Sequence, residues 1–113
     1  MQTIKKSEDI TKVLKEGKII NKPFFKVFYR KNDLSFPRFA FIAPKKVFKK
    51  AVLRNRARRL MREAVRLNFD LFKDLSYDII FIARFDIIGL KLQNILQDIK
   101  DIPILLQNEK NFN

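Results

Sequence analysis

The sequence predicts a single α+β domain in which helices pack on a small β-sheet. Two observations support this fold class. Along the chain, apolar residues change between the alternating spacing of strands and the three-to-four-residue spacing of helices, and no repeat, linker or low-complexity tract divides the 113 residues. Hydrophobic residues make up 47% of the chain, with twelve phenylalanines against two glycines. Regular elements with large core side chains are therefore expected.

The first third of the chain predicts a short helix and two strands. Ser7 is a suitable N-cap for a helix with apolar residues at helical spacing, which Gly17 ends. Residues 24–30 alternate in the manner of a strand, and residues 38–44 form a second strand after the turn residues KNDLSFP. We expect these two strands to pair with each other as a hairpin.

The rest of the chain predicts a helix, a buried strand and a last helix. Residues 51–68 have the spacing of an amphipathic helix. The continuous apolar run at residues 79–83 predicts a strand buried on both faces, and therefore a central one. Residues 90–102 return to helical spacing, and we expect Pro103 to break or kink that helix. The polar tail, residues 108–113, is expected to be frayed.

A helical wheel separates the segment 51–68 into an apolar stripe and a basic remainder. The stripe, which should pack on the sheet, consists of Leu53, Ala57, Leu60, Met61 and Ala64. Opposite the stripe, or flanking it near the start of the helix, lie Arg54, Asn55, Arg56, Arg58, Arg59, Arg62 and Arg66. The chain from residue 45 to residue 66 holds ten basic residues and one acidic residue, Glu63.

This concentration of charge indicates a polyanionic partner. The formal net charge is +13, and such an excess destabilises a compact chain unless an anion balances it. Surface helices usually carry both acidic and basic residues, which form ion pairs between positions three or four apart. This helix has almost no acidic residues and can form almost none of these pairs. The planar arginine fork binds phosphate through two hydrogen bonds and stacks on bases. We interpret the helix as a nucleic-acid-binding surface.

The composition excludes several classes of function. The sequence contains no cysteine and no histidine, which excludes thiol chemistry, disulfides, imidazole catalysis and ordinary zinc sites. The first residues have no apolar run typical of a signal peptide, and no stretch of about 18 apolar residues occurs, so a cytoplasmic location is expected. The apolar residues of the arginine-rich helix are small, whereas a helix that inserts into a membrane surface exposes large apolar side chains. Insertion of this helix into a membrane surface is therefore disfavoured.

A protein nuclease built on carboxylates is the remaining catalytic alternative. Its magnesium ligands would come from Asp74, Asp78 and Asp86. Asp78 and Asp86 bracket a strand that rises roughly 3.3 Å per residue, so they should lie at its opposite ends, too far apart to share one ion. The sequence therefore favours structural roles for these acids at strand ends and turns.

The run KKVFKKAVLRNRARRLMRE resembles the signature of the bacterial ribonuclease P protein component, with its basic pair and its Arg-Asn-Arg order. The segment KSEDITKVLKEGK is similar to that family's first helix, RFAFIAPKK to the strand before the basic pair, and YDIIFIAR to its late strand. The resemblance covers about residues 4–102 and implies one domain over residues 1–113. A free-standing RNA-binding module, ribosomal or associated with RNA decay, is the alternative and need not contain this order.

The resemblance implies an accessory subunit of a ribonucleoprotein endoribonuclease that frees the mature 5′ end of transfer RNA. The catalytic RNA would hold Mg²⁺ and perform the hydrolysis, with no catalytic or metal-binding residue on this chain. The implied partners are that RNA and precursor tRNA, with no obligate protein partner and no membrane. The implied fold is an α-β sandwich of order α-β-β(-β)-α-β-α with a left-handed crossover into the Arg-rich helix, against the usual handedness.

The resemblance also implies two RNA-binding surfaces. The surface for the catalytic RNA would comprise Lys45, Lys46, Arg54, Asn55, Arg56, Arg58, Arg59, Arg62 and Arg66. The second surface, a cleft between the first helix and the sheet that holds the single-stranded 5′ leader, would comprise Ile10, Lys12, Leu14, Phe25, Lys26 and Tyr29. Family members often have phenylalanine in place of Ile10 and Leu14, so stacking on leader bases would fall to Phe25 and Tyr29. The alternative for either aromatic ring is a place in the core.

Overall fold

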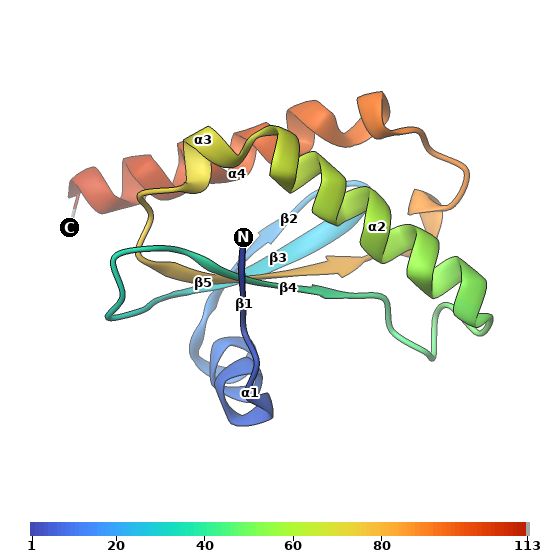
Figure 1. Ribbon diagram of the computed structural model, residues 1–113, viewed down its shortest axis with the longest axis horizontal. Helices are drawn as coiled ribbons and strands as arrows, with labels where there is room; N and C mark the ends of the chain where they lie inside the picture. Colours follow the sequence, from blue (N-terminus) through green and yellow to red (C-terminus); the bar gives the residue numbers. More distant parts are fainter. Residues whose placement is uncertain (113) are drawn as a thin grey trace.

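The computed structural model describes the backbone of residues 1–112 and the side chains of residues 1–109. The elements, in chain order, are β1 (Gln2–Thr3), α1 (Ser7–Glu16), β2 (Lys18–Asn21), β3 (Phe25–Lys31), β4 (Arg38–Ile42), α2 (Ala51–Leu67), α3 (Phe69–Phe72), β5 (Tyr77–Ala83), the 3₁₀ turn η1 (Phe85–Ile87) and α4 (Leu92–Phe112). Helix α1 covers one face of a five-stranded sheet, and α2, α3 and α4 cover the other (Figure 1). The predicted α-β sandwich is confirmed.

Strand β5 occupies the centre of the sheet, as its apolar run predicts. The strand order is β1-β4-β5-β3-β2, with β5 parallel to β4 and antiparallel to β3. The predicted hairpin between residues 24–30 and 38–44 is therefore wrong, because β5 lies between these two strands. An apolar strand with both faces buried gains most when both its edges are also paired. The hairpin partner of β3 is instead β2, a strand that is not among those predicted from the sequence.

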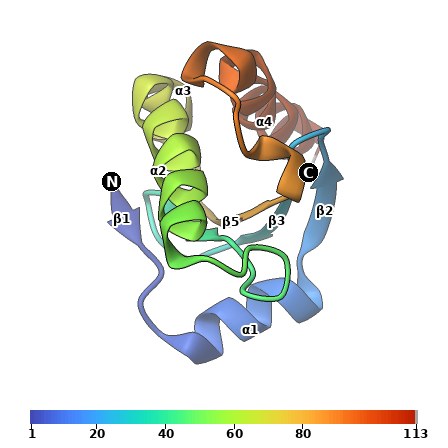
Figure 2. The same ribbon diagram turned by 90° about the vertical axis from the view of Figure 1, so that its right-hand side faces the viewer.

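The connection from β4 to β5 is left-handed. In Figure 1, β4 lies in front of β5 and runs to the right, α2 returns to the left above the sheet, and the chain then descends into β5. Figure 2 gives the same order from the end of the sheet, with β1 on the left and β2 on the right. Parallel crossovers are right-handed in about 98% of cases. The left-handed crossover that the resemblance implied is thus confirmed.

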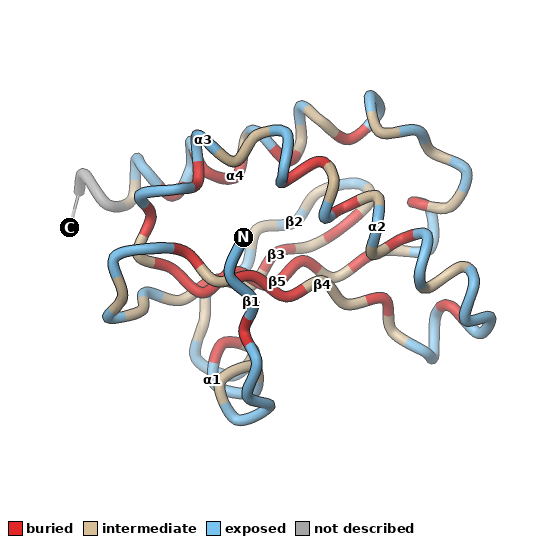
Figure 3. Tube along the Cα trace, viewed as in Figure 1, coloured by how far each residue is buried: buried red, intermediate tan, exposed pale blue. Residues whose placement is uncertain are grey.

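The larger core lies between the sheet and the layer of α2, α3 and α4, where the buried residues gather (Figure 3). The ring of Phe81 lies at its centre, with ring centroids 5.8 Å from Phe25, 5.5 Å from Phe41 and 6.5 Å from Phe72. A smaller core on the other face joins α1 to the sheet, and its buried members are Ile4, Val13, Ala40 and Ile80. Both faces of the central strand are thereby removed from water.

Helix α1 begins and ends beside the sheet. Its N-cap residue is Lys6, with no capping side chain, so the prediction that Ser7 caps this helix is wrong; Ser7 is its first residue. Gly17 ends the helix as predicted. A Cβ atom at Gly17 would lie 2.7 Å from the carbonyl oxygen of Tyr29 and would also clash with that of Val13. Glycine is therefore needed for the close approach of the chain to β3.

Helix α4 continues through Pro103, so the predicted break is wrong. Proline in a helix interior costs about 3 kcal/mol. The side chains of Ile95, Ile99, Ile102 and Leu106 are fully buried against the core, and each is worth roughly 1.5–3 kcal/mol. Their burial outweighs the lost backbone bond. The tail expected to be frayed, residues 108–113, is helical as far as Phe112, and Asn113 lies outside the described residues.

Glu109 ties the end of α4 to the sheet. Its carboxylate accepts hydrogen bonds from Lys18 Nζ at 2.5 Å and from Tyr29 Oη at 2.6 Å. These two donors stabilise the charged form and lower the pKa of Glu109 below its ordinary value of 4.5. Burial and the bond to Glu109 raise the pKa of Tyr29, so the phenol stays a donor across the working pH range.

We expect Glu109→Gln to destabilise the fold at neutral pH and to matter less in acid. Because the folded pKa of Glu109 is lowered, its contribution is present above the ordinary pKa and is lost as the pH falls through the folded value. Thermal unfolding at pH 7 and at about pH 3 measures the difference between variant and wild type. Glu8→Gln is the matched control, since Glu8 is exposed and forms no salt bridge among the described residues. A difference that stays constant with pH would contradict the assignment.

Candidate nucleic-acid interface

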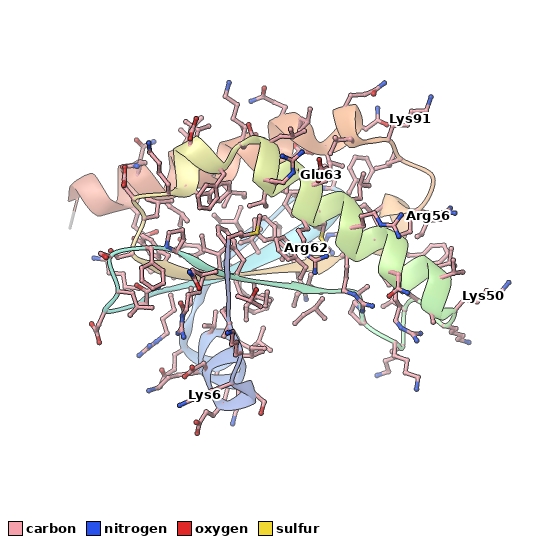
Figure 4. All side chains as sticks on the ribbon, viewed as in Figure 1. Lys6, Lys50, Arg56, Arg62, Glu63 and Lys91 are labelled. Atoms are coloured by element: carbon pink, nitrogen blue, oxygen red, sulfur yellow. The ribbon has the colours of Figure 1, made fainter. Side chains whose placement is uncertain are left out.

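The apolar stripe of α2 is buried as predicted, and it fixes the direction of the arginines. Ala57, Met61 and Ala64 are at most 1% exposed, and Leu53 and Leu60 are partly buried against the same core. Val65, which lies outside the predicted stripe, is also fully buried. The helix is therefore held rigidly on the sheet, and its basic side chains project from a fixed scaffold (Figure 4).

The exposed side of helix α2 (Ala51–Leu67) forms a ridge, and its basic side chains lie on the two flanks of this ridge. Arg56 and Arg59 border a hollow shared with the segment between β5 and α4. Arg62 and Arg66 border a second hollow, shared with β1, with Ile10 of α1 and with the edge of β4. On a helical wheel most of these residues lie on one side. Tertiary packing instead gives each flank its own apolar neighbours.

The arginines of α2 differ in their ionic partners. Arg56, Arg59 and Arg62 form no salt bridge with any side chain in the described range 1–109. Arg66 is paired with Glu63 one turn earlier, which lowers the pKa of Glu63 and raises that of Arg66. The guanidinium of Arg62 lies 5.5 Å from the ring centroid of Phe41, a cation–π arrangement that orients its planar group.

Arg54 holds the basic segment that precedes α2. Its Nη1 donates to the carbonyl oxygens of Phe48 at 2.8 Å and Lys49 at 3.1 Å. The ring of Phe48 is fully buried and anchors the same segment. Lys45 and Lys46 are exposed on it, on the way into the helix. Arg54 therefore has a positioning role that the sequence did not reveal. One turn on, Arg58 is hydrogen-bonded to Asn55.

Some of the residues predicted for the leader surface do lie between α1 and the sheet. Ile10 and Leu14 of α1 pack beside Phe28 of β3 in the smaller core. Lys26 shares this face, with its Nζ 5.5 Å from the ring centroid of Phe28. Phe28 is therefore an aromatic ring on the α1 side that the prediction missed. The signal was present, because strand alternation places residues 26 and 28 on one face.

Three of the residues predicted for the leader surface are placed elsewhere. Phe25 is fully buried and Tyr29 is 8% exposed, and both belong to the larger core on the opposite face of the sheet. Neither ring offers a face to a base, so their assignment as stacking residues is wrong. Lys12 lies on the outer side of α1 with Glu8 and Lys15, because Val13 and its apolar neighbours take the sheet side. Lys12 therefore lies away from the residues between α1 and the sheet.

The carboxylates considered for a nuclease are not gathered at one place. Asp78 is 7% exposed and accepts two hydrogen bonds from Arg38, at 2.9 and 2.6 Å, and one from Asn32 at 2.9 Å. Asp74 and Asp86 are exposed, before and after β5. Within the part of the chain that the structure describes, no cluster of three or more acids is placed to hold a metal ion, and no helix is long and apolar enough to span a membrane.

Comparison with known proteins decides the family. The family model described as Ribonuclease P matches residues 1–106. The chain belongs to the ribonuclease P protein family. It is 37% identical over 99 residues to the ribonuclease P protein component of Pelotomaculum thermopropionicum, covering 88% of this chain and 87% of that protein. With the Clostridioides difficile component it shares 38% identity, covering 88% and 86%.

Solved structures of ribonuclease P proteins share the fold. The protein from Thermotoga maritima superposes with a TM-score of 0.77 at 25% identity, covering 95% of this chain and 97% of that one. The Staphylococcus aureus protein gives 0.72 at 29% identity, covering 100% and 99%. The chain is therefore a protein subunit of the ribonuclease P endoribonuclease, which acts in transfer RNA processing, and its partner is the ribonuclease P RNA. The free-standing RNA-binding module is not supported.

Proposed function

We propose that the ridge of α2 binds the phosphate backbone of the catalytic RNA. The observation that carries this proposal is that the guanidinium groups of Arg56, Arg59 and Arg62 have no salt-bridge partner within residues 1–109, on a helix whose opposite side is buried. Because the helix is rigid, its arginines lose little conformational freedom on binding. Each planar guanidinium group can donate two hydrogen bonds to a phosphate. Lys45 and Lys46, with Asn55 and Arg58, extend the surface toward the start of the helix.

The proposed contribution to catalysis is electrostatic and positional. Mg²⁺ would be held mainly by the RNA, which would carry out the hydrolysis. By neutralising phosphates, the protein would lower the concentration of metal ions that the folded RNA needs. Each phosphate contact releases condensed counterions, so binding should weaken steeply with salt.

We further propose that the α1 side of the sheet receives the 5′ leader of precursor tRNA. Support comes from the partly exposed ring of Phe28 beside the ammonium group of Lys26, with Ile10 and Leu14 as the apolar wall. Stacking on an aromatic ring with a nearby cation is the usual way in which proteins hold single-stranded RNA. Such a surface would favour the precursor over the mature product, which has no leader.

Phe28→Ala is expected to reduce the preference of the holoenzyme for precursor over mature tRNA about tenfold, since stacking contributes roughly 1–3 kcal/mol per base. Binding of both RNAs to the reconstituted holoenzyme gives this ratio directly. Phe85→Ala is the matched control, because Phe85 is 56% exposed in η1, outside the smaller core. An unchanged ratio in the folded Phe28 variant would remove Phe28 from the leader site.

The overall proposal is tested by cleavage of labelled precursor tRNA at low Mg²⁺, with the protein alone, a bacterial ribonuclease P RNA alone, and the two mixed. Cleavage at the mature 5′ end only in the mixture is the expected result. Cleavage by the protein alone would place chemistry on this chain. Tight RNA binding without stimulation would contradict the proposed contribution to catalysis.

A further inference from the structure

A hollow between α2 and the segment leading into α4 has an apolar floor. Its walls are Ala57 and Leu60 of α2 and, across from them, Ile87, Ile88, Leu90 and Leu92. Its volume is about 190 Å³. Sites for drug-sized molecules measure roughly 300–1,000 Å³, so this hollow holds one ring system rather than a peptide or a helix. Figure 2 shows α2 and the segment between β5 and α4 on the same side of the sheet.

The walls of the hollow are fixed by packing and backbone bonds. Ala57 and Ile87 are each 1% exposed and belong to the larger core. The facing segment turns at Gly89, whose φ of +89° is a left-handed conformation that favours glycine. The backbone N–H of Leu90 donates to the carbonyl of Ile87 at 3.2 Å, closing this turn. The site is therefore formed before any ligand binds.

The rim of the hollow is cationic. Arg56 and Arg59 stand at its mouth, and neither has a salt-bridge partner among residues 1–109. Glu63 also lines the rim, but its charge is balanced by Arg66. Figure 4 shows Arg56 on α2 and Lys91 on the segment before α4. A ligand that complements this site has a flat apolar ring at one end and an anion at the other.

We infer that this hollow receives a single unstacked nucleobase of RNA, with the phosphate attached to that nucleotide held by Arg56 and Arg59. The inference deepens the proposed function and rests on it, since the hollow lies along the flank of the ridge assigned to the catalytic RNA. It adds a feature that phosphate contacts alone lack: a base must leave its stack to enter the site. The hollow would thus fix the register of the RNA on the helix.

The first test uses the isolated full chain and a mononucleotide. Methyl NMR follows the leucines and isoleucines during titration with adenosine 5′-monophosphate, adenosine, and inorganic phosphate. The nucleotide is expected to shift Leu60, Ile87 and Ile88, adenosine to shift the same methyl groups more weakly, and phosphate to leave them unchanged. Identical effects of nucleotide and phosphate, or shifts only outside the hollow, would overturn the inference.

The second test uses the reconstituted complex. Leu90→Trp fills the hollow without changing charge, and Leu105→Trp is the matched control at an exposed position of α4. We expect Leu90→Trp to weaken binding of the ribonuclease P RNA about tenfold and to expose one base to a base-modifying reagent that wild type protects. Wild-type affinity and protection in a folded Leu90→Trp variant would overturn the inference and leave the phosphate-binding role of α2 standing, because that role depends on the arginines.

Discussion

Replacing Arg59 and Arg62 together by alanine is expected to lower the affinity for the ribonuclease P RNA about a hundredfold. A hydrogen bond to a charged group contributes roughly 1.5–3 kcal/mol. Within the described residues, neither arginine forms a salt bridge with a carboxylate that would compete with the RNA phosphate. Both residues lie on the rigid part of α2, where Ala57, Met61 and Ala64 hold the helix against the sheet. The loss is therefore not recovered by rearrangement of the backbone.

The same variant should show a flatter dependence of affinity on salt. Each lost phosphate contact reduces the slope of log K against log salt by about 1, so a reduction of about 2 is expected. Binding is measured over a series of salt concentrations. Lys73→Ala with Lys100→Ala is the control, because Lys73, directly after α3, and Lys100 of α4 are both exposed and their removal changes the net charge equally. If control and test variants lose affinity alike, net charge and not the ridge determines binding.

The second large effect concerns the ion pair between Asp78 and Arg38. Asp78→Ala is expected to reduce the free energy of unfolding by about 3 kcal/mol, because it leaves the Arg38 guanidinium and the Asn32 amide without their shared acceptor. The two residues are register partners on β5 and β4, at the start of both strands. Arg38 also reaches Asp9 of α1 at 3.6 Å, so the cluster joins three elements. This value is at the lower end of the loss that is usual when one partner of a buried ion pair is removed, because the Arg38 side chain is one-quarter exposed.

Chemical denaturation with urea measures this loss for Asp78→Ala. Asp74→Ala is the matched control, since Asp74 is exposed and makes no salt bridge within residues 1–109. The control should remain within about 0.5 kcal/mol of wild type. Equal effects of the two substitutions would mean that Asp78 contributes only as a surface charge.

Elements that depend on local pattern were predictable from the sequence. The stripe of α2 and the central strand β5 are defined by residues close together in the chain, and burial alone determines their orientation. The family signature also lies within one continuous run. The end of α1 at Gly17 was likewise predicted, although the reason is the close approach to Tyr29, which only the fold reveals.

Features that depend on contacts distant in sequence were not predictable. Alternation in β3 showed that Phe25 and Tyr29 share one face and Lys26 and Phe28 the other, but not which face α1 covers. The insertion of β5 and the left-handed crossover decide that, because they place α2 and α4 over Phe25. The continuation of α4 through Pro103 also depends on distant contacts, because Ile99 and Leu106 are buried by the sheet beneath α4.

The sequence by itself determined the three long helices and the strands β3, β4 and β5, the charge of the ridge and the family, because these follow from neighbouring residues and from composition. Tertiary structure decided which aromatic rings lie on the α1 side of the sheet, which arginines lack a carboxylate partner within residues 1–109, and that Arg56 and Arg59 border an apolar hollow. The physical reason is that a side chain's environment is made by whatever the fold brings against it, and for these residues the neighbours come from distant parts of the chain.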